Sequence, residues 1–159
     1  MMYLSEAVGS RQAPVAETLQ LGRVYAHLAE LEALYPDFEQ WYWGKVAPDL
    51  SDGRRGLFCE EQAGTLAGVI IAKRDGLERK LCTVWVDQKF RRTGVSHRIF
   101  KRAMKWLGTD RPMISIPHSR LHEFRGLLAT SNFKQTQIAR SYYRPGCDEY
   151  VFNGSLPLD

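Results

Sequence analysis

A basic turn containing one glycine stands out among the residues that are able to do chemistry. It reads Arg91-Arg92-Thr93-Gly94-Val95-Ser96. Glycine adopts positive φ angles and lets a ligand approach the backbone closely, while the two arginines add formal positive charge. Where a helix begins just after such a turn, its first backbone N–H groups have no intrahelical partner and the helix dipole favours an anion. The turn therefore predicts a binding site for an anion of pyrophosphate size.

A strand and a helix must position this turn. Residues Thr83 to Val86 are β-branched or aromatic, which suits a half-buried strand, and Leu81 and Cys82 extend the run. From Val95 the apolar residues recur at helical spacing as far as Leu107. Gly108 then follows, at the position where glycine commonly ends a helix. The pattern predicts a strand, the anion turn and an amphipathic helix in succession.

This stretch resembles motif A of the GCN5-related N-acetyltransferases (GNAT), Gln/Arg-x-x-Gly-x-Gly/Ala. Arg91 and Gly94 match the motif, and Ser96 departs from it by adding a hydroxyl at a position that is usually glycine or alanine. The resemblance implies that acetyl-CoA is the acyl donor and that Val84–Val86 is the family's splayed strand, whose backbone pairs with the pantetheine arm. It also implies that the N–H of Val86 donates to the oxyanion. The cofactor-binding residues predicted in this way are Val84, Trp85, Val86, Arg91, Arg92, Thr93, Gly94, Val95 and Ser96.

The acid and the base that this family often uses are absent. Leu128 occupies the position where the family often has an acid tyrosine, and the strand Met113–Ile116 offers only Ser115 where a glutamate base is common. Acetyl transfer to an amine still needs a route for the amine proton and an acid for the leaving thiolate. Other residues must therefore take these roles, or the chemistry has been lost.

Tyr143 is the predicted acid. The stretch Arg140-Ser141-Tyr142-Tyr143 resembles the Arg-x-Tyr-Tyr segment of ribosomal-protein alanine Nα-acetyltransferases, in which the tyrosines line the path of the acceptor peptide. On a regular strand Tyr142 and Tyr143 face opposite ways, so one can pack in the core while the other meets the acceptor. A purely structural tyrosine pair is the alternative interpretation.

His118 is the second catalytic candidate, because a histidine just beyond a strand end can relay a proton near neutral pH. A solvated loop histidine is the alternative. Asp87 and Glu123 are further options that also fit an ordinary polar surface. The aromatic run from Trp41 to Trp43 cannot face one way on a helix, so at least one ring is a candidate for contact with the acceptor.

Length and composition limit the remaining possibilities. The 159 residues, 44% hydrophobic and 25% charged, predict a single globular domain over residues 1–159. No apolar run reaches transmembrane length and the first residues do not resemble a signal peptide, so we expect a cytoplasmic protein without a membrane partner. Three widely spaced cysteines and four histidines show no metal-ligand spacing, so no metal site is predicted.

The order of patterns along the chain predicts the fold class. Two helical stretches, Val15–Leu34 and Phe38–Val46, precede a polar turn at Pro48–Arg55. Three strands in a meander, the central helix, a strand, a helix and a final hairpin follow; their predicted bounds are Gly56–Glu61, Thr65–Lys73, Lys80–Asp87, Val95–Leu107, Met113–Ile116, Ser119–Thr130, Lys134–Tyr142 and Glu149–Phe152. A short strand is also expected near Tyr3–Ala7. This is an α/β layout. The resemblance over roughly residues 15–153 adds a GNAT-like mixed, mostly antiparallel sheet with a splayed central strand and helices on both faces.

The leading functional hypothesis is transfer of an acetyl group from acetyl-CoA to a primary amine of a peptide or protein, with a small-molecule amine as the second option. A noncatalytic CoA-binding module is an alternative, because Leu128 and Ser115 replace the usual acid and base. Another is an acetyltransferase acting on an RNA-linked amine, since the net charge is +4. Much of the positive charge lies between Lys89 and Lys105, where it can serve the CoA phosphates, and no RNA-binding motif is present; nucleic acid is therefore not the predicted partner. A homodimer is left open.

Overall fold

The computed structural model describes residues 15–158, and its centre is a six-stranded mixed sheet. The strand order is β1-β2-β3-β4-β6-β5, and every neighbouring pair is antiparallel except β3 with β4. The strands are β1 (Arg55–Gln62), β2 (Thr65–Asp75), β3 (Glu78–Val86), β4 (Met113–Pro117), β5 (Gln135–Arg144) and β6 (Cys147–Phe152). The predicted strand at Tyr3–Ala7 lies outside the described residues.

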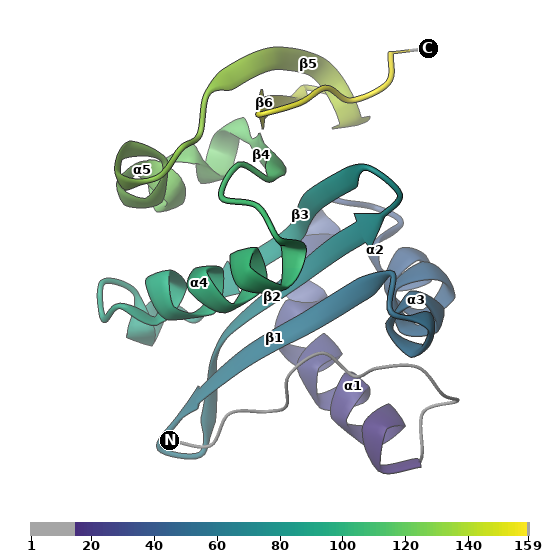
Figure 1. Ribbon diagram of the computed structural model, residues 1–159. Helices are drawn as coiled ribbons and strands as arrows, with labels where there is room; N and C mark the ends of the chain where they lie inside the picture. Colours follow the sequence, from purple (N-terminus) through teal and green to yellow (C-terminus); the bar gives the residue numbers. More distant parts are fainter. Residues whose placement is uncertain (1–14, 159) are drawn as a thin grey trace.

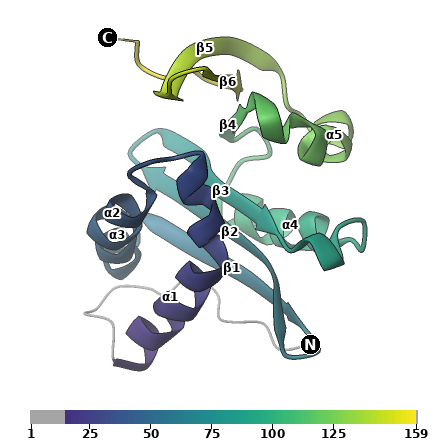
Figure 2. The same cartoon turned by 180° about the vertical axis from the view of Figure 1, so that it is seen from behind.

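One face of the sheet is covered by the N-terminal helices (Figures 1 and 2). These are α1 (Val15–Leu28), the 3₁₀ turn η1 (Ala29–Ala33), α2 (Phe38–Trp41), the π-helical turn η2 (Tyr42–Val46) and α3 (Ala47–Asp52). Their buried side chains, Val24, Leu28 and Phe38 among them, pack against Val69 and Ile71 of β2. Gly22 does not interrupt α1.

The predicted turn at Pro48–Arg55 is wrong in its first half, which forms α3. Pro48 occupies the first turn of this helix, where its missing N–H costs nothing. Gly53, with φ of 81°, ends the helix in the left-handed conformation. The sequence pattern did not indicate this short helix, because Leu50 is its only fully buried apolar residue.

The other face of the sheet is covered by α4 (Val95–Leu107) and by α5 (Leu121–Thr130), which follows the 3₁₀ turn η4 (His118–Arg120). Gly68 of β2 lets α4 approach closely, since a Cβ atom there would lie 2.5 Å from Ile99 Cδ1 and 2.9 Å from Val95 Cγ1. Helices therefore cover both faces of the sheet, as predicted. None of the helices in residues 15–158 is long and apolar enough to cross a membrane.

The parallel pair at the centre of the sheet is very short. β3 and β4 pair only at Lys80 with Met113 and at Leu81 with Ile114. Beyond Leu81 the two strands diverge, so the second half of β3 has a partner only on its β2 side. The predicted splayed central strand is confirmed. A splay of this kind leaves backbone N–H and C=O groups available to a ligand.

Candidate active site

The anion turn has the geometry needed to present backbone amides. A 3₁₀ turn, η3 (Gln88–Phe90), leads from β3, and Asp87 caps it by accepting from the N–H of Lys89. Arg92 and Gly94 then adopt positive φ angles of 64° and 87°. The first hydrogen bond of α4 runs from the Arg98 N–H to the Gly94 carbonyl at 3.2 Å, so the three amides before it lie ahead of the helical ladder. The helix N-terminus can therefore donate to an anion.

A groove of about 680 Å³ runs from this turn along the splay. Its walls come from β3 (Val84, Val86), from the turn (Arg91, Arg92, Gly94, Ser96) and from α5 (Glu123, Phe124, Leu127). The Asp87 N–H donates to Ala67 on β2, so the backbone groups of Val86, one residue earlier, point away from β2 and into the splay. An extended ligand arm in the groove can pair with this edge of β3.

Arg120 occupies part of the splay and was not singled out by sequence. Its Nη2 donates to the carbonyl of Val84 at 2.8 Å and lies 3.1 Å from Glu123 Oε2. Glu123 also approaches Arg91 Nη2 at 3.6 Å, so one carboxylate links α5 to the anion turn. This Arg120–Glu123–Arg91 network therefore forms part of the groove wall.

Not all of the predicted cofactor residues face the groove. Those that line it are Val84, Val86, Arg91, Arg92, Gly94 and Ser96. Trp85 points to the opposite face of the sheet, where its Nε1 donates to Glu30 at 2.6 Å. Val95, the first residue of α4, is buried in the core. The Thr93 hydroxyl donates to the Phe90 carbonyl. For these three residues a contact with acetyl-CoA stays a prediction.

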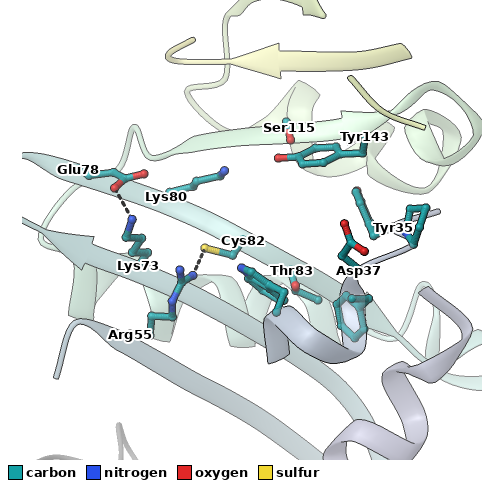
Figure 3. A pocket seen from close by; sticks show the side chains of 13 residues that line it. Tyr35, Asp37, Arg55, Lys73, Glu78, Lys80, Cys82, Thr83, Ser115 and Tyr143 are labelled. Atoms are coloured by element: carbon teal, nitrogen blue, oxygen red, sulfur yellow. Dashed lines mark hydrogen bonds and ion pairs between the residues drawn. The ribbon is translucent and has the colours of Figure 1, made fainter. Parts of the chain in front are cut away.

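A second cavity, of about 280 Å³, opens on the other side of β3 (Figure 3). Aromatic side chains, Tyr35, Trp41 and Tyr143, form part of its wall. A narrow space of about 20 Å³ shares Tyr35, Cys82, Thr83 and Ser115 with this cavity, and Val84, Arg120 and Phe124 with the groove. The groove, the narrow space and the cavity thus adjoin one another along a path through the splay, which Arg120 partly occupies.

Tyr143 stands at the cavity end of this path, and its hydroxyl points toward Ser115 (Figure 3). Its ring meets Tyr35 edge-on at 5.2 Å, and burial raises the pKa of Tyr143 to about 12. The hydroxyl is therefore protonated at neutral pH and able to donate. Tyr142 packs against the small cluster around Ala139 and Val151.

The expected alternation of Tyr142 and Tyr143 is only partly found. The two rings contact each other at 4.8 Å, because the β5–β6 register shifts between Ala139 and Arg144 and Ser141 has a φ of 46°. Tyr142 packs in a cluster while Tyr143 lines the cavity, and contact of Tyr143 with the acceptor stays a prediction.

Glu149 on β6 is a buried carboxylic acid that was missed by sequence reasoning. Its side chain is 1% exposed, and its Oε2 has no hydrogen-bond partner among the described residues. Burial raises the pKa of Glu149 to about 7, while a hydrogen bond with Ser115 and the charges of Lys80 and Arg120 act in the opposite direction. The Tyr143 hydroxyl points toward Ser115 (Figure 3), so this serine lies between the phenol and the carboxylate. A signal was present in the sequence, because Glu149 shares a strand face with buried Val151.

His118 lies outside both the groove and the cavity. It is exposed, and its ring approaches Tyr150 at 5.6 Å. The structure therefore does not bring His118 together with Tyr143, and a catalytic role for it stays a prediction. Within residues 15–158 no group of three or more His, Cys, Asp or Glu side chains is placed to hold a metal ion.

Comparisons with known proteins agree on the class. The sequence model of the acetyltransferase (GNAT) family matches residues 17–113. A protein from Desulfovibrio desulfuricans described as a GNAT-family acetyltransferase superposes with a TM-score of 0.62 at 14% identity, over 89% of this chain and 94% of that chain. An acetyltransferase from Staphylococcus epidermidis gives a TM-score of 0.60 at 14% identity, over 90% and 93%. A search of curated proteins finds no match.

A third similar structure contains the donor. It is described as a streptothricin acetyltransferase from Bacillus anthracis in complex with acetyl-CoA, with a TM-score of 0.54 and 14% identity over 62% of this chain. The present chain spans 61% of its length.

Because the family model matches more than half of the sequence, this chain belongs to the GNAT acetyltransferases. Its predicted acyl donor, acetyl-CoA, is the donor of that family and is bound in one of these similar structures.

Proposed function

We propose that this protein transfers the acetyl group of acetyl-CoA to a primary amine that enters the cavity beside Tyr143. The observation that carries the proposal is that the groove at the anion turn, the narrow space in the splay and that cavity adjoin one another along one path. A donor held by the turn and by the free edge of β3 places its thioester at the narrow part of the path. An amine in the cavity then approaches from the opposite side, as direct transfer requires.

The residues around the narrow part supply a complete route for protons. The amine attacks the thioester carbonyl carbon, and the N–H of Val86 donates to the oxyanion that forms. The amine proton passes to Ser115, whose own proton goes to Glu149. As the C–S bond breaks, Tyr143 donates its proton to the leaving thiolate. Every proton that the reaction moves then has a described donor and acceptor.

A peptide or protein amine remains the first candidate acceptor and a small-molecule amine the second. The first is supported by the resemblance around Tyr142 and Tyr143, and the second by the limited cavity of about 280 Å³. The same proposal includes a single domain, supported by the one continuous sheet, and a place in the cytoplasm, with which the free thiols of Cys59, Cys82 and Cys147 agree.

Two measurements on the purified protein test the proposal. Calorimetry gives the affinity for acetyl-CoA, and release of the CoA thiol reports turnover with a panel of peptides and small amines. Binding together with amine-dependent thiol release supports the proposal. Binding without turnover on any amine indicates the noncatalytic CoA-binding module, and absence of binding at moderate salt rejects both. RNA binding that saturating CoA does not diminish would favour an RNA-linked acceptor.

A further inference from the structure

Three cationic side chains form a row across the sheet at the floor of the cavity. In the register of the first three strands, Arg55 of β1 lies opposite Lys73 of β2, and Lys73 lies opposite Lys80 of β3. Residues that lie opposite one another on neighbouring strands point to the same face. All three side chains line the cavity, as Figure 3 shows. Like charges in such positions destabilise a sheet, so this row costs stability unless anions neutralise it.

The protein neutralises only two members of the row. The Arg55 Nε lies 2.9 Å from Asp49 Oδ2, and the Lys73 Nζ lies 2.7 Å from Glu78 Oε2. Lys80 is half-buried, yet within residues 15–158 it forms no ion pair. One positive charge of the row is therefore left over, and it faces the space that the acceptor enters.

The charge of Lys80 acts on the nearby carboxyl group of Glu149, but Glu149 does not line the cavity and no ion pair joins the two side chains among the described residues. The charged and titratable groups that do line the cavity leave Lys80 without a partner. Glu78 is already paired with Lys73, and Asp37 lies on the opposite side of the cavity, next to Tyr35 (Figure 3). Cys82, on the same strand as Lys80, accepts from Arg55 Nη1 at 3.1 Å, and burial raises the pKa of its thiol. Cys82 is therefore neutral at pH 7 and supplies no negative charge.

We propose that the acceptor amine carries a carboxylate, and that Lys80 binds this carboxylate while the amine lies at Ser115 and Tyr143. The inference rests on the proposed acetyl transfer. Lys80, Ser115 and Tyr143 all line one cavity of about 280 Å³, so the amine and the carboxylate belong to the same small unit. That unit is a free amino acid, through its α-carboxylate, or a peptide whose first side chain is acidic.

Pairs of acceptors that differ only in this charge test the proposal. The first arm compares free amino acids with their amides, and the second compares amidated dipeptides that begin with glutamate or with glutamine. We expect kcat/KM for one carboxylate-bearing acceptor to exceed that of its neutral partner by about 10- to 100-fold, the range for a charge-assisted hydrogen bond. The arm that shows the larger ratio identifies the source of the carboxylate.

The variant Lys80→Gln connects the preference to this residue. It should lower the ratio between the two acceptors to near one, mainly by raising KM for the charged acceptor, and Lys80→Arg should restore part of the preference. Lys134→Gln, an exposed lysine before β5, is the matched control and should keep the parental ratio. Circular dichroism and thermal unfolding check that the variants are folded.

Several outcomes would overturn the inference. If the neutral acceptor has the same kcat/KM as its charged partner, the carboxylate inference is wrong, while the proposed acetyl transfer is unaffected. An equal loss of kcat/KM for both acceptors in Lys80→Gln also overturns the inference, because Lys80 then acts only through its effect on the pKa of Glu149. Turnover with carboxylate-free amines alone rejects the carboxylate and supports the proposed function, whereas absence of turnover with every amine counts against both.

Discussion

At the scale of single residues, the β5–β6 hairpin carries the two groups to which the proposed mechanism assigns proton transfer. Tyr143 closes the end of β5 and Glu149 lies in β6, with Ser115 of β4 between them. A phenol whose pKa is raised to about 12 keeps its proton, and a carboxyl group whose pKa is raised to about 7 exchanges its proton near neutral pH. The two groups are thus matched to the acid and base steps respectively.

We expect Tyr143→Phe to reduce kcat by about 10²- to 10⁴-fold, the usual effect of losing one proton donor. Affinity for acetyl-CoA should stay unchanged, because Tyr143 does not line the groove. Steady-state kinetics and calorimetry measure the two effects. Tyr142→Phe is the matched control, since that ring packs against the Ala139 and Val151 cluster. Parental turnover in Tyr143→Phe would exclude Tyr143 as the acid, and a defect confined to KM for the acceptor would make it a binding residue.

Glu149→Gln should remove one step from the pH profile of turnover. A base must be deprotonated, so kcat/KM of the parent should rise with pH through about 7, and the glutamine variant should lack this rise. Asp148→Asn is the control, because a hydrogen bond from Arg140 holds the pKa of that neighbouring carboxyl below its usual range. If the rise near pH 7 persists in Glu149→Gln, another group is the base.

We also expect Glu149→Gln to change how the free energy of unfolding depends on pH. The folded state raises the pKa of Glu149 from its ordinary 4.5 to about 7, so burial favours the protonated form. Its contribution to stability is present below pH 4.5 and is lost as the pH rises to 7. Between these limits the free energy of unfolding of the parent should fall by about 2–3 kcal/mol relative to Glu149→Gln. Urea unfolding of both proteins at pH 4.5, 6 and 8 measures the difference, and parallel pH dependences would contradict it.

At the scale of elements, the start of α4 depends on the backbone conformation of one residue. Gly94 has a φ of 87°, where an L side chain costs about 1–2 kcal/mol, and a Cβ atom there would lie 2.9 Å from Arg98 Nη1. Gly94 also lines the groove, so a change at this position alters the anion site directly.

Gly94→Asp should therefore weaken acetyl-CoA binding by at least about 10-fold, since it adds both a side chain and a negative charge at the anion site. Gly94→Ala should have a smaller effect of the same sign. Gly22→Ala, in the interior of α1 with no atom within 4 Å of the added Cβ, should leave the affinity unchanged and raise the free energy of unfolding by about 0.5–1 kcal/mol. Calorimetry and urea unfolding give both quantities. Parental affinity in Gly94→Asp would place the CoA phosphates elsewhere.

At the scale of the whole molecule, two halves meet along a short seam. Figure 1 shows β4, β5, β6 and α5 grouped together beside the layer of β1, β2 and β3. Between the halves, only two residue pairs join β3 to β4 in the sheet. The groove draws its walls from both halves, so a ligand in it contacts each of them.

Acetyl-CoA should therefore stabilise the protein and slow amide exchange at the seam. At about 100 times its dissociation constant, a ligand that binds only the native state adds about 2.7 kcal/mol to the free energy of unfolding. We expect the largest added protection in the second half of β3, in the anion turn and in α5. Hydrogen–deuterium exchange read by mass spectrometry, with Gly94→Asp as the nonbinding control, tests this. Protection confined to the cavity around Tyr35 and Trp41 would contradict the placement of the donor.

The sequence by itself determined the strand, anion turn and helix from Thr83 to Leu107, and through them the family. Each of these features depends on neighbours a few residues apart: β-branched residues in a strand, one glycine at a turn, and apolar residues at helical spacing. The order of the strands and the splay came with the resemblance. The short helix α3 was missed, because six residues with a single fully buried apolar side chain carry too little periodicity to be recognised.

Only the tertiary structure decided the chemistry of the cavity. Ser115 and Glu149 become neighbours because β4 pairs with β6, and the row of Arg55, Lys73 and Lys80 exists only in the register that β1, β2 and β3 adopt. A shift of one residue in any of these registers would turn such side chains to the other face of the sheet. Register is set by bulges and by burial across the whole sheet, so residues far apart in the chain come together at a site whose composition no local pattern contains.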